Sequence, residues 1–278
     1  MIKNIAETLR DYISLAAKKM EQPIWKRTLL GIMAGAFIAL GAATSSVAMH
    51  SISSVGIARV VGGCIFPIGL MLIVFLGGEL FTGDCLAIMA CVEKKSSIFD
   101  LVKLLFCVWV TNFAGGLIVA ILIVNSGELS YSDGMLGAYT IKVAMGKVNI
   151  SFLQGVCSGI LCNIFVCGAV LMASMTKDMI GKILAVFFPI MAFVVGGFEH
   201  CVANMYYIPA GIFAAGNVRY AESAMSEYGF TRDELMSLNW QSFFFQNELP
   251  VTIGNIIGGM VCIGIVLLIL NKKEVEKS

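Results

Sequence analysis

Six long apolar stretches, separated by short charged segments, dominate the hydropathy pattern of this chain. Each stretch is long enough to cross the hydrocarbon core of a bilayer as a helix. They cover residues 28–49, 58–91, 101–124, 151–175, 183–214 and 249–270. The pattern therefore predicts an all-α integral membrane protein with six transmembrane helices.

The second and fifth stretches are too long for one simple crossing. A continuous helix over residues 58–91 would be about 50 Å long, against a hydrocarbon core of about 30 Å. Both stretches also carry polar residues in mid-course, LFTGD at 80–84 and GGFEHCVANM at 196–205. Unwound backbone at membrane depth is tolerated only where it is buried in protein or lines a polar cavity. We therefore expect spans two and five to be broken and the breaks to face each other across a pathway.

Three motifs of the first half of the chain return in the second half. They are GxxxG at 31–35 and 155–159, FPI followed by a double glycine and an acid at 66–79 and 188–199, and NFAGG at 112–116 with NIIGG at 255–259. Because each half holds three spans, the halves are predicted to be inverted repeats. GxxxG pairs permit close helix approach, which we expect to support assembly of several copies.

Composition and charge fit this membrane architecture. The chain is 58% hydrophobic and 13% charged, with a mean hydropathy of +0.88. A net charge of +1 provides no basic face for nucleic acid. Fourteen Lys and Arg lie on the side of the two termini and five on the other. The positive-inside rule then predicts a multi-pass protein of the inner (cytoplasmic) membrane with both termini cytoplasmic.

Three parts of the chain are expected on this basis. Residues 1–27 are read as an amphipathic cytoplasmic helix that lies on the membrane or on a neighbouring subunit. Residues 28–270 form the six-span domain, and residues 271–278 form a cytoplasmic tail. The bilayer is thus a partner of the whole central domain.

The nine cysteines lie in or beside the apolar stretches, where a thiol behaves as a small hydrophobe. Cys157, Cys162 and Cys167 recur every five residues, a spacing that turns them to different faces of a helix. We therefore expect no metal site and no cofactor.

Ionisable side chains inside spans are costly and by default functional. Four occupy the two breaks: Glu79, Asp84, Glu199 and His200. The acids either cap backbone N–H groups or face the pathway, whereas His200 is expected to face the permeating species. The hydroxyl of Thr82 can donate to an anion. Half-helices that begin after each break would aim partial positive charge at the centre, which favours a small monovalent anion.

Four strings together resemble the formate/nitrite transporter family. They are GGELFTGD, GGFEHCVANMYYIPAGIF, ILCNIFVCGAVLM and ELPVTIGNIIGG, and the similarity covers residues 5–270. Within the family the chain looks most like the hydrosulfide channel branch. The resemblance implies an aquaporin-like fold that assembles as a homopentamer, with an anion pore in each protomer.

The resemblance also implies roles for individual residues. Leu70 and Phe193 would form the cytoplasmic hydrophobic constriction, and Thr82 and His200 would mark the central chamber. Lys147 would lie at the outer entrance and attract anions. The outer half of the pathway would be lined by Asn163, Val166 and Asn255. The two breaks would be supported by Phe81 and Glu199.

These expectations favour a passive or pH-gated channel for small monovalent anions, namely hydrosulfide, formate or nitrite, with hydrosulfide preferred. A proton-coupled formate or nitrite carrier stays open, because a histidine can lend a proton in transit. Aquaporin-type channels for neutral solutes carry paired Asn-Pro-Ala signatures, which this sequence lacks. A membrane enzyme using Glu199 and His200 as acid and base would need a metal pair, nucleophile elbow or nucleotide motif, and none is present. The chain is therefore expected not to be an enzyme.

Overall fold

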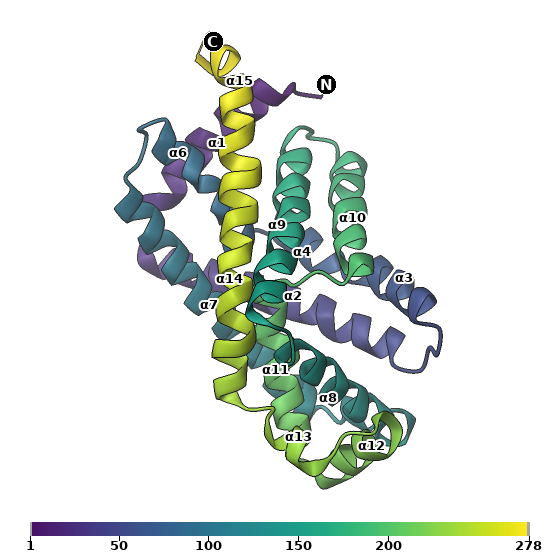
Figure 1. Ribbon diagram of the computed structural model, residues 1–278. Helices are drawn as coiled ribbons and strands as arrows, with labels where there is room; N and C mark the ends of the chain where they lie inside the picture. The colour runs from purple at the N-terminus through teal and green to yellow at the C-terminus, as the bar shows by residue number, and fades with distance from the viewer. Residues whose placement is uncertain (1, 277–278) are drawn as a thin grey trace.

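The computed structural model describes residues 2–276, and these residues form helices and connecting loops without a β-strand (Figure 1). Six helical segments are long and apolar enough to cross a membrane. They are Ile24–Met49, Val55–Leu76, Ile98–Asn125, Phe152–Ser174, Met179–Gly196 and Ser242–Val275. The prediction of six apolar spans in an all-α protein is confirmed. Positions 277–278 of the expected tail lie outside the described residues.

Spans one, three and four are single helices, and span six is one continuous helical rod. The helices are α2 (Ile24–Met49), α7 (Ile98–Asn125) and α9 (Phe152–Ser174). The rod joins a π-helical stretch (Ser242–Glu248) to α14 (Leu249–Ile256), a second π-helical stretch (Ile257–Ile265) and α15 (Val266–Glu276). It begins seven residues before the predicted start at 249.

Spans two and five are broken, as predicted. In span two, α3 (Val55–Ile65) and α4 (Ile68–Leu76) lead to a non-helical segment, after which come α5 (Phe81–Asp84), a short 3₁₀ turn (Cys85–Ala87) and α6 (Ile88–Val92). In span five, α10 (Met179–Gly196) and α11 (Cys201–Ala215) flank the gap. A glycine with positive φ follows the helix before each gap, Gly77 at +94° and Gly197 at +70°. A positive φ suits glycine and ends the helix in both cases, with Gly197 left-handed helical and Gly77 extended at ψ 149°.

The repeated FPI motif occupies different places in the two halves. Pro67 lies at the junction of α3 and α4, ten residues before Gly77, whereas Pro189 lies inside α10, eight residues before Gly197. The two prolines are therefore out of register by two residues. Only the first falls where one helix gives way to the next.

The repeated glycines bring helices of the same chain into close contact. A Cβ on Gly115 of α7 would come within 2.1 Å of the Ile32 carbonyl oxygen on α2, and one on Gly258 within 2.4 Å of the Ile160 oxygen on α9. The GxxxG glycines face the same two interfaces: Gly35 lies against Asn112, and Gly159 against Val251. Our expectation that the GxxxG pairs support assembly is therefore wrong, because their close contacts lie within one protomer.

The amphipathic N-terminal helix, α1 (Ile5–Met20), packs on its own chain. Asn4 and Glu7 form a capping box at its start, and Leu9, Tyr12 and Ile13 are buried. The Tyr12 hydroxyl donates to the Gly83 carbonyl oxygen at 3.0 Å. The expectation that this face lies on the membrane or on a neighbouring subunit is wrong, since it covers the end of the second span instead.

Three helices, α8 (Met135–Val148), α12 (Val218–Tyr228) and α13 (Arg232–Met236), were not predicted at all. Helix α8 precedes α9, as α1 precedes α2, but its glycines and lysines keep its hydropathy low. Further elements on this side are two 3₁₀ turns (Glu128–Ser130 and Ser132–Gly134). Figure 1 shows α8, α12 and α13 at the end of the molecule opposite the two termini.

Candidate functional site

A cavity of about 180 Å³ lies against the second break. His200, at the start of α11, lines it together with Phe193 near the end of α10 and Lys147 near the end of α8. Phe66, Tyr207 and Arg59 complete much of the wall. We call this cavity the chamber. Three of the ten residues expected to line or support a pore, Lys147, Phe193 and His200, are thus brought together around one space.

His200 links the two breaks by a hydrogen bond to Thr82. Its Nδ1 accepts the backbone N–H of Ala203 at 3.0 Å, so His200 caps the N-terminus of α11. A neutral ring that accepts at Nδ1 carries its proton on Nε2. That Nε2 lies 3.0 Å from the Thr82 hydroxyl oxygen and donates to it, which leaves the hydroxyl proton free to point elsewhere. Two polar side chains from distant segments therefore meet at the predicted centre.

The second break is fixed by one buried amide. Asn255 of α14 is fully buried, and its Oδ1 accepts the Cys201 N–H at 3.0 Å. Its Nδ2 donates to the carbonyl oxygens of Gly159 at 2.8 Å and Glu199 at 3.1 Å. Asn255 thus satisfies the Cys201 N–H and the Glu199 carbonyl, two backbone groups of the break, and ties them to Gly159 within α9.

The first break is fixed in the same way by Asn112 of α7. Its Oδ1 accepts the Phe81 N–H at 2.9 Å, and its Nδ2 donates to the oxygens of Gly31 at 2.8 Å and Glu79 at 2.9 Å. The repeated asparagines therefore have the same three kinds of partner. This pattern matches Gly31 with Gly159, so the two GxxxG motifs are one helical turn out of register. The opposite orientation of the two halves in a membrane stays a prediction.

Each break also holds an acid paired with a lysine. Lys147 Nζ donates to both carboxylate oxygens of Glu199, at 3.0 and 3.1 Å. Lys19 Nζ of α1 lies 2.6 Å from a Glu79 oxygen and 2.8 Å from an Asp84 oxygen. Lys19 lies twelve residues before Gly31, and Lys147 lies twelve before Gly159. This spacing identifies Lys19 as the counterpart of Lys147 once the glycines are aligned correctly.

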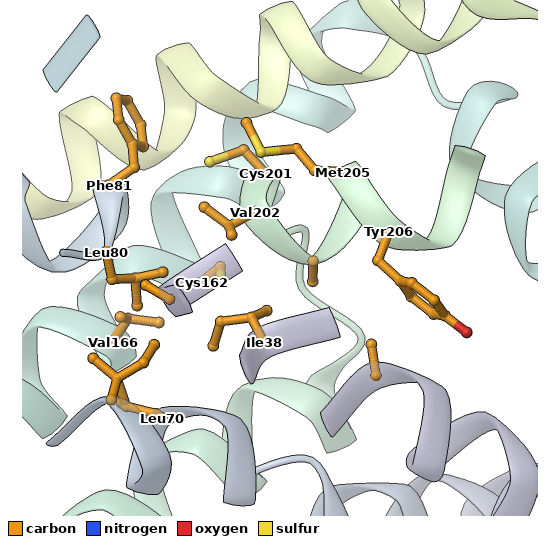
Figure 2. Close-up of a cluster of buried hydrophobic side chains, with 14 of the residues drawn as sticks. Ile38, Leu70, Leu80, Phe81, Cys162, Val166, Cys201, Val202, Met205 and Tyr206 are labelled. Carbon is orange, nitrogen blue, oxygen red and sulfur yellow. The ribbon is translucent and has the colours of Figure 1, made fainter. Parts of the chain in front are cut away.

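The apolar residues expected to form the constriction are buried near this centre. Phe193 stacks on the His200 ring with centroids 5.9 Å apart and meets Phe66 edge-on at 5.5 Å. Leu70 is 2% exposed and belongs, with Val166, to the buried apolar cluster of Figure 2. Phe193 thus joins the apolar wall to the histidine. Its role as a constriction, like that of Leu70, stays a prediction.

Several expected pore residues do not line the chamber. Asn163 is fully buried and donates to the oxygens of Thr82 at 3.1 Å and Asn255 at 2.6 Å. Asn255 uses its whole amide on the backbone. Phe81 donates its N–H to Asn112 and so belongs to the support of the first break. The expected lining by Asn163, Val166 and Asn255 is untested, and the hydrogen bonds add a supporting role for both asparagines.

Sequence reasoning missed four residues of this framework. Lys19 and Asn112 act in the first break, while Asn204 and Asn247 donate amide hydrogens to Glu199 at 2.7 and 3.2 Å in the second. The repeated NxxGG motif marked Asn112 but gave it no partner. Nothing in the sequence signalled Asn247, which lies in the π-helical stretch at the start of the last span, before the start predicted at 249.

The chain as a whole is similar to proteins of a known family. The family model described as formate/nitrite transporter matches residues 6–269. A probable formate transporter of Methanothermobacter thermautotrophicus is 35% identical, with 93% of each chain covered. A formate channel of Haemophilus influenzae is 36% identical, covering 87% of this chain and 85% of the relative. A solved pentameric formate channel with formate bound is 31% identical, with a TM-score of 0.80, and the match covers 90% of this chain and 98% of that one.

Proposed function

Since this chain belongs to the formate/nitrite transporter family, we propose that it is a homopentameric channel for small monovalent anions, with formate as the substrate to test first. The relatives cited above are named for formate, and none of them points to the hydrosulfide branch that the sequence motifs favoured. Hydrosulfide and nitrite remain the finer alternatives. The proposed location is the inner membrane, with both termini in the cytoplasm.

The hydrogen bond between Thr82 and His200 carries this proposal. It brings a hydroxyl and an imidazole, 3.0 Å apart, to the meeting point of two broken spans. The N-termini of α5 and α11 begin beside these residues, and a helix N-terminus favours negative charge. The acids nearby are paired with lysines, so they do not oppose an anion with their full charge. The centre can therefore replace part of the hydration of a small anion.

Flux into proteoliposomes tests the proposal. The purified protein should carry formate, nitrite or hydrosulfide as a current, and should exclude glycerol. Phe193→Ala and Leu70→Ala should raise flux or admit larger anions such as acetate, because either change widens the proposed constriction. Glycerol flux without an anion current would contradict the proposal. Anion uptake that strictly requires an inward proton gradient would favour the proton-coupled carrier instead.

A further inference from the structure

A second cavity adjoins the chamber and shares part of its wall. It has a volume of about 530 Å³ and lies between α3, α8 and the end of α12. We call it the vestibule. The two cavities share four lining residues, Met49, Arg59, Tyr139 and Val143. Arg59 therefore lies in the wall between the vestibule and the chamber that holds His200.

The cations along this route differ in how far they are neutralised. Lys147, in the chamber, is balanced by Glu199 at 3.0 Å. In the vestibule wall, Lys142 lies over the Tyr228 ring at 4.5 Å, and Glu227 adds one negative charge. Within residues 2–276, no carboxylate oxygen lies within 4.0 Å of an Arg59 nitrogen. Arg59 thus has a positive charge at the junction that no described carboxylate neutralises by direct contact.

The position of Arg59 is fixed by the second break. Its Nη1 donates to the Val195 carbonyl oxygen at 3.2 Å, at the end of α10. The guanidinium also covers Gly197, where an added Cβ would come within 2.7 Å of Nη1. The carbonyl end of a helix carries partial negative charge and would repel an anion. Arg59 offsets that charge where α10 ends beside the chamber.

We infer that Arg59 binds the permeating anion at the junction of vestibule and chamber and selects for anions with two oxygens. This inference rests on the proposed anion flux. A guanidinium offers parallel N–H donors that can form two hydrogen bonds with one carboxylate. In Arg59, Nη1 already donates one hydrogen bond to the Val195 carbonyl oxygen. Formate and nitrite have two oxygens in this geometry, whereas hydrosulfide has a single acceptor atom. Arg59 is thus a residue that favours formate and nitrite over hydrosulfide.

Substitutions that separate charge from shape test the selection. Arg59→Gln removes both, and should raise the formate concentration for half-maximal flux about tenfold. Arg59→Lys restores the charge without the paired donors, so it should leave hydrosulfide near the parent value while formate stays about threefold weaker. Arg232→Gln is the matched control, because it removes one exposed arginine on α13 that does not line either cavity. Equal changes for formate and hydrosulfide in Arg59→Lys would overturn the selection.

A binding measurement separates this inference from the proposed function. Phenylglyoxal modifies exposed arginines, and peptide mass spectrometry reports Arg59 and Arg232 in one sample. Formate should slow modification of Arg59 severalfold and leave Arg232 unchanged. Protection without any anion current would support the site and reject the proposed flux. A formate current with no protection of Arg59, and with unchanged kinetics in Arg59→Gln, would overturn the site and leave the flux standing.

Discussion

The two breaks share one framework and differ in the side chains that it presents. In both, a glycine with positive φ ends a helix, an asparagine from the third span of that half holds the loop, and a lysine pairs with the acid two residues after the glycine. The N-cap position after the gap holds Leu80 in the first break and His200 in the second. Two residues later, the first break has Thr82 and the second has Val202.

This difference shows that the framework is repeated while the polar chemistry is divided. Each half supplies one polar side chain to the centre, at different positions of the break, and the two meet at 3.0 Å. Leu80 and Val202, which occupy the exchanged positions, are buried in the apolar cluster (Figure 2). Duplicated structure therefore gives a centre with only one histidine and one hydroxyl.

The acids differ too. Asp84 of the first break corresponds to Asn204 of the second, five residues after Glu79 and Glu199 respectively. Lys19 serves two carboxylates, whereas Lys147 serves one, which also receives amide hydrogens from Asn204 and Asn247. The two carboxylates of the first break thus depend on a single lysine, whereas Glu199 of the second break is stabilised by one lysine and two amides.

The largest expected effect comes from removing the lysine of each break, which tests this difference in charge. Lys19→Met leaves Glu79 and Asp84, which are 3% and 1% exposed, without their cation, and should lower the free energy of unfolding by about 3–5 kcal/mol. Lys147→Met should cost less, because two amides still donate to Glu199. Thermal unfolding in detergent measures both.

A control and a rescue accompany these lysine variants. Lys142→Met removes a lysine of the same helix as Lys147 that lies over a tyrosine ring rather than beside an acid, so a small effect is expected. Adding Asp84→Asn to Lys19→Met should recover part of the loss. Equal melting temperatures for Lys19→Met and Lys147→Met would contradict the asymmetry of the two breaks.

The next effect tests what the breaks have in common. Asn112→Leu and Asn255→Leu each remove three hydrogen bonds to backbone groups, two of them at groups of the break itself, and each should cost about 3 kcal/mol. The two losses should be similar. Asn125→Leu, on the same helix as Asn112, removes one exposed hydrogen bond and should change stability little. A large loss of stability from only one of the two substitutions would show that the two asparagines do not contribute equally to the free energy of unfolding.

Much of this framework follows from the sequence, because its signals are local. The six apolar stretches, the excessive length of spans two and five, and the polar strings within them are sufficient to predict the breaks. The NxxGG repeat marks both asparagines. These features depend on segment length, polarity and spacing, which are read directly along the chain.

The pairings across the molecule could not be predicted in the same way. Lys19 lies in a cytoplasmic-looking amphipathic helix, and its 2.6 Å contact with Glu79 joins residues sixty positions apart. Helix α8 was missed because it is too polar to read as a span, and with it the place of Lys147 beside Glu199. Such lysines form ion pairs with buried acids only once the helices have packed together, and the packing is not visible along the sequence. The pattern of residues along the chain predicts even less about which anion is the substrate.

A smaller effect sharpens the comparison by exchanging the differing acids. Asp84→Asn makes the first break resemble the second and should change stability by less than about 1 kcal/mol. The effect is small because Lys19 still pairs with Glu79. In addition, the Oδ2 atom of Asp84 has no hydrogen-bond partner among the described residues. Asn204→Asp places a second carboxylate beside Glu199 and removes the amide that donates to it. It should destabilise clearly more. The reverse order in thermal unfolding would contradict our account of the paired charges.

The smallest expected effect on the folded protein concerns His200 itself. A doubly protonated ring would set Nδ1–H against the Ala203 N–H, which it now accepts at 3.0 Å, and so break the cap of α11. The ring is only 3% exposed, and the Lys147 cation lines the same chamber, so burial and charge add to the N–H contact in disfavouring protonation. We therefore expect the formate current to change little through His200 between about pH 7 and 5. His200→Asn keeps a good N-cap and cannot titrate, so it should retain current and keep the parent's pH profile. His50→Asn is the control, at the only other histidine, which lies in the vestibule and bonds Ser132 at 2.8 Å. A pH response that disappears in His200→Asn and persists in His50→Asn would show that the buried ring does gain a proton in this range, and would contradict this account.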